Sequence, residues 1–293
     1  MKSIKPYDTN PVKPSYAMPP GACDAHCHVF GPAQKFPYAP DRTYTPKDAG
    51  FETLRALHRH LGIDRAVIVQ ASCHGSDNRA TLDAIARSDG AYRGIAMVEG
   101  DVTDAELEAL DRGGIRGIRY NFVAHLGGAP DLEIFDRTIG RIKDLGWHVV
   151  LHLDSGDLLT YADRLEHIPV PFIIDHMGRA KVAAGIEQKP FQQLLALMRH
   201  NERAWVKVSG AERISAAGAP FTDAIPFAAA LIEAAPDRVL WGTDFPHPNI
   251  SGDMPNDGEL VNLFAMFSRD EAVRRKVLVD NPSRLYWPEK AAA

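Results

Sequence analysis

The chain has 293 residues, of which 45% are hydrophobic and 24% charged, and its formal net charge is −5. These proportions are typical of a globular protein, and the lack of a basic stripe argues against a nucleic-acid partner and against an anionic membrane surface. The three cysteines form no CxxC pair, no apolar leader opens the chain, and no run of about 18 apolar residues occurs. We therefore expect a cytoplasmic protein with free thiols and no membrane-spanning helix.

The first 20 residues contain five prolines and show little periodicity. They predict an extended N-terminal arm (residues 1–20) that lies on the domain or on a neighbouring copy in a homo-oligomer. Residues 21–293 predict a single domain, because no linker divides them and no repeat recurs. In this domain, short runs rich in Val and Ile alternate with amphipathic segments, a pattern typical of buried parallel strands between helices. The expected strands span 23–29, 65–71, 92–98, 114–121, 147–154, 171–177, 204–210 and 238–245.

The segments between the strands carry helix start and stop signals. One segment ends at Gly62, another opens with Thr103 and Glu106 at the spacing of a capping box, and a third begins with Pro190. The expected helices span 51–62, 103–114, 131–145, 157–166, 190–200, 222–235 and 258–280. Eight strands that alternate with helices over roughly 250 residues predict an α/β fold, a single-domain (β/α)8 TIM-type barrel. A doubly wound open sheet is the alternative, but no Gly-rich phosphate loop follows the first strand.

Polar residues end most of the predicted strands, and in a (β/α)8 barrel these ends build the active site. His26 and His28 lie one residue apart in the first strand, so both side chains leave the same face, and Asp244 ends the last strand. A single histidine in such a place is more often hydrogen-bonded scaffold, but burying so many polar groups unpaired at one rim would be costly. The other polar residues at strand ends are Gln70, Ser72, His74, Arg119, Asn121, His152, Asp175, His176, Lys207, Ser209 and Arg213.

The donor types at this rim suit a metal ion. Neutral imidazoles with a carboxylate bind divalent transition metals, and nitrogen-rich ligation favours zinc. A zinc-bound water, with its pKa lowered to about 7, is a competent nucleophile at neutral pH. We therefore expect one Zn²⁺ ion, with metal-free catalysis as the alternative. The candidate ligands are His26, His28, His152, His176 and Asp244.

Several motifs together resemble the amidohydrolase superfamily: DAHCHVFG, VIVQASCHGSDNRATLDAIA, GIRYNF, IDHMGR, WGTDFPHPN and NPSRLYW. Within that superfamily, almost the whole chain is most similar to the 2-pyrone-4,6-dicarboxylate lactonase family of aromatic-compound catabolism. The resemblance implies a distorted (β/α)8 barrel that hydrolyses the ester of a small anionic lactone. It implies Asp244 as the catalytic base and His26, His28 and His176 as catalytic histidines.

The resemblance also implies a substrate pocket that binds acidic groups through Arg119, Arg179 and Arg213. The guanidinium fork donates two parallel hydrogen bonds to a carboxylate, although surface ion pairs are the alternative interpretation of each arginine. The loop 30–48, which contains four prolines, is expected to cover the mouth of the barrel. Further residues expected to line the pocket are Tyr44, Ser72, His74, His125, His247 and Asn249.

The sequence departs from the lactonase family at two positions. His125 stands where that family has a further arginine, and His152 stands where it has a tyrosine. The first change weakens the case for an identical dicarboxylate. The second restores a histidine that metal-dependent members use, whereas the pyrone lactonases work without metal. The chain also resembles the lactonases that act on 4-sulfomuconolactone, which are associated with zinc. A two-metal site is not expected, because no lysine ends the fourth strand.

Two other functions stay open at this stage. The same barrel and histidines serve decarboxylases and hydratases of unsaturated dicarboxylic acids, and a non-catalytic barrel that sequesters aromatic acids is the third hypothesis. Cys27 lies between the two histidines and is expected to face the helical layer as a small apolar group. Five histidines carry no functional expectation: His58, His60, His148, His167 and His200.

Overall fold

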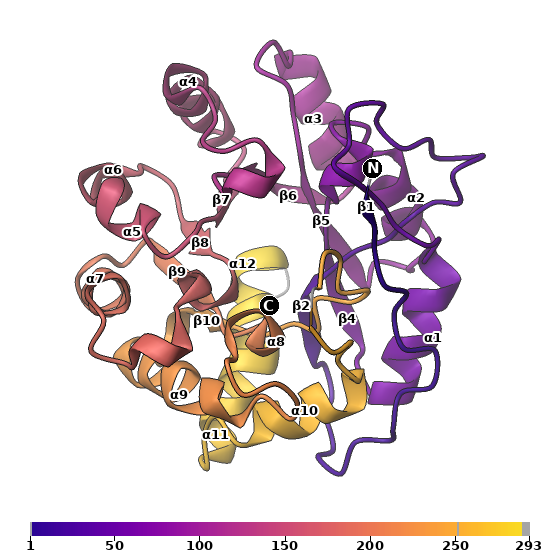
Figure 1. Cartoon of the computed structure of the whole chain (residues 1–293). Helices are drawn as coiled ribbons and strands as arrows, with labels where there is room; N and C mark the ends of the chain where they lie inside the picture. Colours follow the sequence, from indigo (N-terminus) through magenta and orange to yellow (C-terminus); the bar gives the residue numbers. More distant parts are fainter. Residues whose placement is uncertain (1, 251, 289–293) are drawn as a thin grey trace.

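The computed structural model describes residues 2–250 and 252–288 and shows eight parallel strands in a ring, with helices around it (Figure 1). The strand order β10-β9-β8-β7-β6-β5-β4-β2 follows the chain, as in a (β/α)8 barrel. All eight predicted strands are confirmed, and most are shorter than the apolar runs that predicted them. Their bounds are β2 (Cys23–Cys27), β4 (Arg65–Val69), β5 (Tyr92–Ala96), β6 (Ile115–Asn121), β7 (His148–His152), β8 (Phe172–Ile174), β9 (Ala204–Lys207) and β10 (Val239–Leu240).

Backbone hydrogen bonds close the ring between its first and last strands. The amide of Ala25 donates to the carbonyl of Trp241 (2.9 Å), and the amide of Asp244 donates to the carbonyl of His26 (2.7 Å). A third bond joins the amide of His28 to the carbonyl of Phe245 (2.8 Å). This seam places the two histidines directly beside the segment that carries Asp244.

The helices cover the outside of the ring (Figure 1). The stop at Gly62, which adopts a left-handed conformation (φ 82°), and the capping box of Thr103 and Glu106 are both confirmed. The helices of the described residues are α1 (Phe51–Leu61), α2 (Arg79–Ala86), α3 (Asp104–Arg112), α4 (Leu132–Ile142), α5 (Asp157–Thr160), α6 (Ala162–His167), α7 (Lys189–His200), α8 (Ala211–Ile214), α9 (Ile225–Ala234), α10 (Asp257–Ala265), α11 (Glu271–Arg275) and α12 (Asn281–Tyr286).

Two predicted helices are broken in the structure. The segment 157–166 divides into α5 and α6 at Tyr161, whose backbone leaves the helical region (φ −108°, ψ 20°). The segment 258–280 divides because the carboxylate of Asp270 accepts a hydrogen bond from the amide of Ala272 and thereby starts α11 as its N-cap. A π-helical turn at Lys276–Asp280 then leads into α12.

The interior of the barrel has an apolar floor. A separate cluster of buried apolar side chains, distinct from the layer between strands and helices, takes members from nearly every strand, including Val150, Ile173 and Trp205. Tyr286 and Trp287, at the end of α12, complete this cluster, and Figure 1 shows α12 within the ring. The floor closes one end of the barrel, so a ligand has access from the other end.

An irregularity in β2 sets the direction of its side chains. Cys23 and Ala25 belong to the apolar floor, whereas Cys27 lies in the outer layer between strands and helices, as predicted. Strict alternation would place Cys27 on the same side as Cys23 and Ala25. The pairing of β2 with β4 shifts register between Asp24 and Cys27. A bulge of this kind redirects the following side chains, and here it turns His26 toward the interior.

The N-terminal arm lies along its own barrel. Lys2–Ser3 (β1) pairs in parallel with Tyr44–Thr45 (β3) of the loop after β2. Farther along, the amide of Val12 donates to Asn256 (3.0 Å), and the amide of Ser15 donates to Asn262 (2.7 Å). The homo-oligomer stays a prediction. In the part of the chain that the structure describes, no helix is long and apolar enough to cross a membrane.

Candidate active site

The open end of the barrel brings three histidines from two strands to a single carboxylate oxygen. Oδ1 of Asp244 lies 3.3 Å from Nε2 of His28, 3.6 Å from Nε2 of His26 and 4.0 Å from Nε2 of His176. All four side chains are buried. Residues separated by more than 200 positions therefore converge, as the strand-end argument predicts.

The backbone around these groups is strained. His176 (φ 51°), Arg179 (φ 49°) and Asp244 (φ 63°) all adopt left-handed conformations, which residues other than glycine rarely take. Such conformations concentrate at functional sites. Two glycines make room for the histidines: a Cβ on Gly210 would lie 2.6 Å from Nδ1 of His176, and one on Gly242 would lie 2.4 Å from the backbone nitrogen of His26.

Asp244 is held ionised by Arg213. The arginine donates from Nε to Oδ2 of Asp244 and from both terminal nitrogens to the carbonyl of Pro248 (3.1 Å each). Burial raises the pKa of Asp244, but the charge of Arg213 and the nearby His176 and His28 outweigh it and hold this pKa well below its usual range. An ionised carboxylate with one free oxygen is the state that a general base requires.

A second buried carboxylate lies behind the histidines. Oδ1 of Asp175 is 3.2 Å from Nζ of Lys207 and 3.3 Å from Nδ1 of His26, and its Oδ2 is 3.6 Å from Arg119. Burial raises the pKa of Asp175, but Lys207 first, and then His26 and Arg119, lower it well below its usual range. Asp175 and Lys207 each lie two residues after a side chain of the apolar floor, Ile173 and Trp205 respectively, so alternation along the strand points them inward as well.

Three histidines of the site have pKa values below the ordinary histidine value and are neutral at physiological pH. Burial, with a smaller contribution from Lys207, lowers the pKa of His26 to about 4. Burial also lowers the pKa of His176 and of His152 well below the ordinary histidine value. His28 shares a 2.7 Å hydrogen bond between its Nδ1 and the carbonyl of Val69. Because a carbonyl only accepts, Nδ1 of His28 donates this bond and carries a proton.

The residue types at this site are those of a metal centre. His26, His176 and Asp244 offer ligand atoms that all lie within 4.8 Å of one another. Nε2 of His26 and Oδ1 of Asp244 are buried and have no hydrogen-bond partner among the described residues. His28 is oriented by a hydrogen bond to a backbone carbonyl, a common second contact of metal-bound histidines. These side chains are therefore the candidates to hold a metal ion.

His152 stands slightly apart from this group. Its ring centre lies 5.7 Å from that of His176, and its Nδ1 is 3.2 Å from Oδ1 of Asn121. Its Nε2 is buried and has no hydrogen-bond partner within the described ranges. Its role as a metal ligand stays a prediction.

A cavity of about 330 Å³ lies beside Arg213, the partner of Asp244. Arg179 forms an ion pair with the half-exposed Asp154 (2.8 Å) and lines this cavity. Burial lowers the pKa of His125, which faces Arg179 in the same cavity. The other lining residues are Thr43, Glu212, Arg213, Asn249, Ile250 and Gly252.

Five of the predicted pocket residues lie outside this lining, and Arg119, which is buried behind the histidines, is one of them. Tyr44 is buried, and the hydroxyl of Ser72 donates to its hydroxyl over 3.4 Å. His74 bridges the amide of Gly31 (3.3 Å) and the carbonyl of Pro37 (3.1 Å), and thereby fixes the loop 30–48. His247 is completely enclosed, as described next. Substrate contact by these residues stays a prediction.

Three acidic residues near the site were not predicted. Nε2 of His247 lies 3.2 Å from Asp257, and its Nδ1 lies 3.7 Å from Glu212. Although burial lowers the pKa of His247, Asp257 and Glu212 together raise it to about 10. The third residue, Asp154, neutralises Arg179. Asp154, at the end of a predicted strand, and Glu212, directly before the predicted Arg213, had a signal in the sequence, whereas Asp257 lies at the start of a helix and had none.

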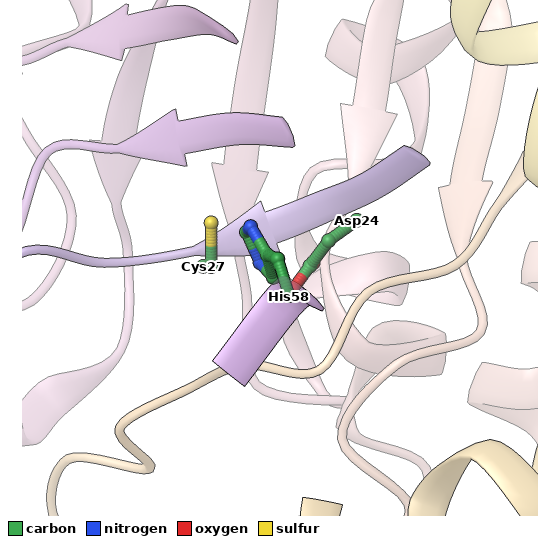
Figure 2. A group of neighbouring side chains, drawn as sticks. All are labelled: Asp24, Cys27 and His58. Atoms are coloured by element: carbon green, nitrogen blue, oxygen red, sulfur yellow. The ribbon is translucent and has the colours of Figure 1, made fainter. Parts of the chain in front are cut away.

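A cluster of Asp24, Cys27 and His58 lies on the outer face of β2 (Figure 2). It supports the seam between the first and last strands of the barrel. Asp24 accepts hydrogen bonds from the amides of His26 and Thr243 (3.0 Å each) and from the hydroxyl of Thr243. His58 of α1 contacts the other side of Asp24 (3.3 Å) and the hydroxyl of Tyr92 (2.7 Å). Since protein groups already occupy these donor and acceptor atoms, the cluster is a structural network rather than a metal site.

Comparisons with known proteins agree with this geometry. The family profile described as Amidohydrolase matches residues 23–287. A 2-pyrone-4,6-dicarboxylate hydrolase from Comamonas testosteroni is 46% identical over 96% of this chain and 95% of its own. A 4-sulfomuconolactone hydrolase from Rhizobium radiobacter is also 46% identical, over 93% and 92%. A solved structure from Acinetobacter baumannii, described as a probable 2-pyrone-4,6-dicarboxylic acid hydrolase with citric acid bound, has a TM-score of 0.80 and 26% identity over 91% of this chain and 99% of its own.

Proposed function

Because this chain belongs to the amidohydrolase family, we propose that it is a hydrolase that opens the ester ring of a small anionic lactone. The observation that carries the proposal is the ionised Asp244, which keeps one free oxygen among three imidazoles and is bound through its other oxygen by Arg213, a residue that also lines a cavity. The substrate class is a lactone with two acidic groups, of which 2-pyrone-4,6-dicarboxylate is our first candidate. The names of the relatives support a lactone, and the citric acid in the Acinetobacter protein supports an acidic ligand.

A second candidate substrate is 4-sulfomuconolactone. The relative from Rhizobium radiobacter that carries this name is as similar as the pyrone hydrolase. His125 lines the cavity beside Arg179, and an imidazole is a smaller and weaker anion ligand than a guanidinium. His125 therefore favours neither a carboxylate nor a sulfonate by itself. Measured turnover of the two lactones distinguishes between them.

The mechanism assigns a separate task to each group. Asp244 accepts a proton from the attacking water through its free Oδ1, while Arg213 on Oδ2 keeps the carboxylate ionised and oriented. The imidazoles of His26, His28 and His176 surround the reacting carbonyl and stabilise the charge that develops on its oxygen. Arg179 and His125 bind an acidic group of the substrate at the other side of the cavity. Collapse of the tetrahedral intermediate expels the ring oxygen, and Asp244 returns the proton.

By residue type, one Zn²⁺ ion is the metal that this set of side chains would take. His26, His28, His176 and Asp244 would hold it, with His152 as a further predicted ligand. When bound, the ion would supply a Lewis acid next to the lactone carbonyl.

The decisive experiment is a turnover screen of anionic lactones by the purified protein, with and without a chelator. We expect ring opening, measured as loss of pyrone absorbance, without release of carbon dioxide. Carbon dioxide release or hydration of an unsaturated diacid, with the lactones untouched, would replace the proposal by a decarboxylase or hydratase. Tight binding of aromatic acids without any turnover would replace it by a binding protein.

The role of Asp244 has its own test in the same assay. Asp244→Asn should lower kcat by on the order of 10²-fold or more with little change in KM, because the base acts in the chemical step. Asp154→Asn, which removes a half-exposed carboxylate on the rim, should keep most of kcat. Turnover by Asp244→Asn close to that of the wild type would reject the assignment.

A further inference from the structure

Lys207 is a lysine in the interior of the barrel that the mechanism above leaves without a task. Its side chain is completely buried, and its Nζ lies 3.0 Å from Nδ1 of His26 in a hydrogen bond and 3.2 Å from Oδ1 of Asp175 in an ion pair. Complete burial of a lysine is rare unless the charge is paired. The ion pair with Asp175 accounts for the buried charge of Lys207, but it does not account for the hydrogen bond to His26.

The chemistry of the pair fixes the position of one proton. An ammonium group donates three hydrogen bonds and accepts none, so Nδ1 of His26 accepts the bond from Lys207. A neutral imidazole that accepts at Nδ1 carries its proton on Nε2. Asp175 could have selected the opposite tautomer, since its Oδ1 lies 3.3 Å from the same Nδ1. However, Lys207 is the closer of the two partners, with its Nζ 3.0 Å from Nδ1 in a hydrogen bond.

The next histidine along the chain carries a proton on its other ring nitrogen. Nδ1 of His28 donates to the carbonyl of Val69. The two imidazoles point their Nε2 atoms at the same oxygen of Asp244, from 3.6 Å for His26 and 3.3 Å for His28. With its proton on Nε2, His26 is a donor toward this oxygen. A His-x-His pair that binds a metal through both Nε2 atoms would need two lone pairs.

We propose that Lys207 is a positioning residue that holds His26 in the Nε2–H tautomer, so that this imidazole offers an N–H to the lactone carbonyl oxygen rather than a lone pair to a metal ion. The oxyanion part of this inference rests on the proposed lactone hydrolysis, whereas the tautomer does not. Removal of Lys207 leaves Asp175 as the acceptor for Nδ1–H of His26. That change frees the lone pair on Nε2 and completes the ligand set for zinc.

The first test reads the tautomer directly. Nitrogen-15 NMR of the metal-free wild-type protein with labelled histidine should show His26 with a protonated Nε2 and an unprotonated Nδ1. The signals are assigned by comparison with His26→Gln. In Lys207→Met the same residue should change to protonated Nδ1. A wild-type His26 with its proton on Nδ1, or an unchanged tautomer in a folded Lys207→Met variant, would overturn the proposal. The wild-type spectrum decides even when the variant does not fold.

The second test measures zinc affinity by competition with a chromophoric chelator. Lys207→Met should bind zinc about tenfold or more tightly than the wild type, as expected when the partner of a ligand histidine is changed. Lys189→Met, which removes one exposed lysine charge far from the site, should bind zinc like the wild type. Weaker or equal zinc binding by Lys207→Met contradicts the proposal. Tighter binding without a change of tautomer also contradicts it, because loss of a positive charge alone then explains the gain. Neither test uses turnover, so a failure of lactone hydrolysis is recognised separately.

Discussion

Each of the three arginines expected to bind substrate already has a carboxylate partner. Arg119 faces Asp175, Arg179 binds Asp154 at the rim, and Arg213 binds Asp244. Their exposure differs, because Arg119 is buried behind the histidines, whereas Arg179 and Arg213 line the cavity. The carboxylate partner determines the role of each arginine. A substrate carboxylate easily displaces Asp154 from Arg179 at the rim, but it does not displace the catalytic base Asp244 from Arg213.

Arg179→Met should therefore affect substrate binding. We expect a KM at least about tenfold higher for a lactone with two acidic groups and almost no change for a neutral lactone, because a charge-assisted hydrogen bond contributes about 1.5–3 kcal/mol. The measurement is steady-state kinetics on a matched pair of charged and neutral lactones. An equal loss for both substrates would show that Arg179 supports the fold of the rim instead.

Arg213→Met should affect the chemical step. Without the guanidinium, Asp244 loses the main charge that keeps it ionised, so its pKa rises and the base is protonated at higher pH. We expect a lower kcat at neutral pH and an acidic limb of the kcat profile that moves toward neutral pH. Arg213→Lys should restore part of kcat. A change confined to KM would mean that Arg213 binds substrate, as the resemblance implies.

The sequence could predict which residues end the strands but not which of them contact each other. His26, His28, His176 and Asp244 were recognisable because polar residues interrupt apolar runs. Lys207 and Asp175 were visible for the same reason, but their pairing depends on the closure of the barrel. His247 shows the limit most clearly, because its partner Asp257 lies at the start of a helix whose packing no local pattern describes.

At the scale of elements, the bulge in β2 has the largest consequence. The eight strands and most helices follow from apolar periodicity and capping signals. The register shift between Asp24 and Cys27 does not, because a bulge is set by the neighbouring strand and by Asp24, which accepts hydrogen bonds from the amides of His26 and Thr243. Regular alternation along β2 would point His26 away from the interior. The sequence therefore gives the correct face for the two histidines only if β2 is taken to be irregular.

Asp24→Asn tests this support. The amide side chain loses the charge and replaces one acceptor by a donor that faces the hydroxyl of Thr243. We expect a loss of about 1–3 kcal/mol in the free energy of unfolding and a lower kcat, since both His26 and the segment of Asp244 lose their anchor. Chemical denaturation and kinetics measure the two effects. Asp64→Asn is the matched control, because its carboxylate binds only the amide of Gly21 in an exposed turn. A change in Asp24→Asn no greater than in this control would contradict the anchoring role.

At the scale of the whole molecule, the barrel is an apolar floor covered by a buried polar layer. Buried histidines in and around this interior have pKa values that move in opposite directions. Burial lowers the pKa of His148 to about 3 and that of His26 to about 4. Acidic neighbours raise the pKa of His247 to about 10 against the effect of burial. An unfolded chain has all three near 6.5.

These shifts predict a stability maximum close to pH 6.5. As the pH falls from 6.5 toward 4, the unfolded chain binds protons at His26 and His148 that the folded protein does not, so the free energy of unfolding falls by about 1.4 kcal/mol per pH unit for each histidine. As the pH rises from 6.5 toward 10, the folded protein retains a proton on His247 that the unfolded chain has lost, so stability falls again. Melting temperatures between pH 4 and 9 at constant ionic strength measure both limbs. His247→Gln should flatten the alkaline limb only, and His167→Gln, an exposed histidine, should change neither. An alkaline limb that persists in His247→Gln would mean that Asp257 and Glu212 do not hold an imidazolium, and that the buried pair is balanced by another charge.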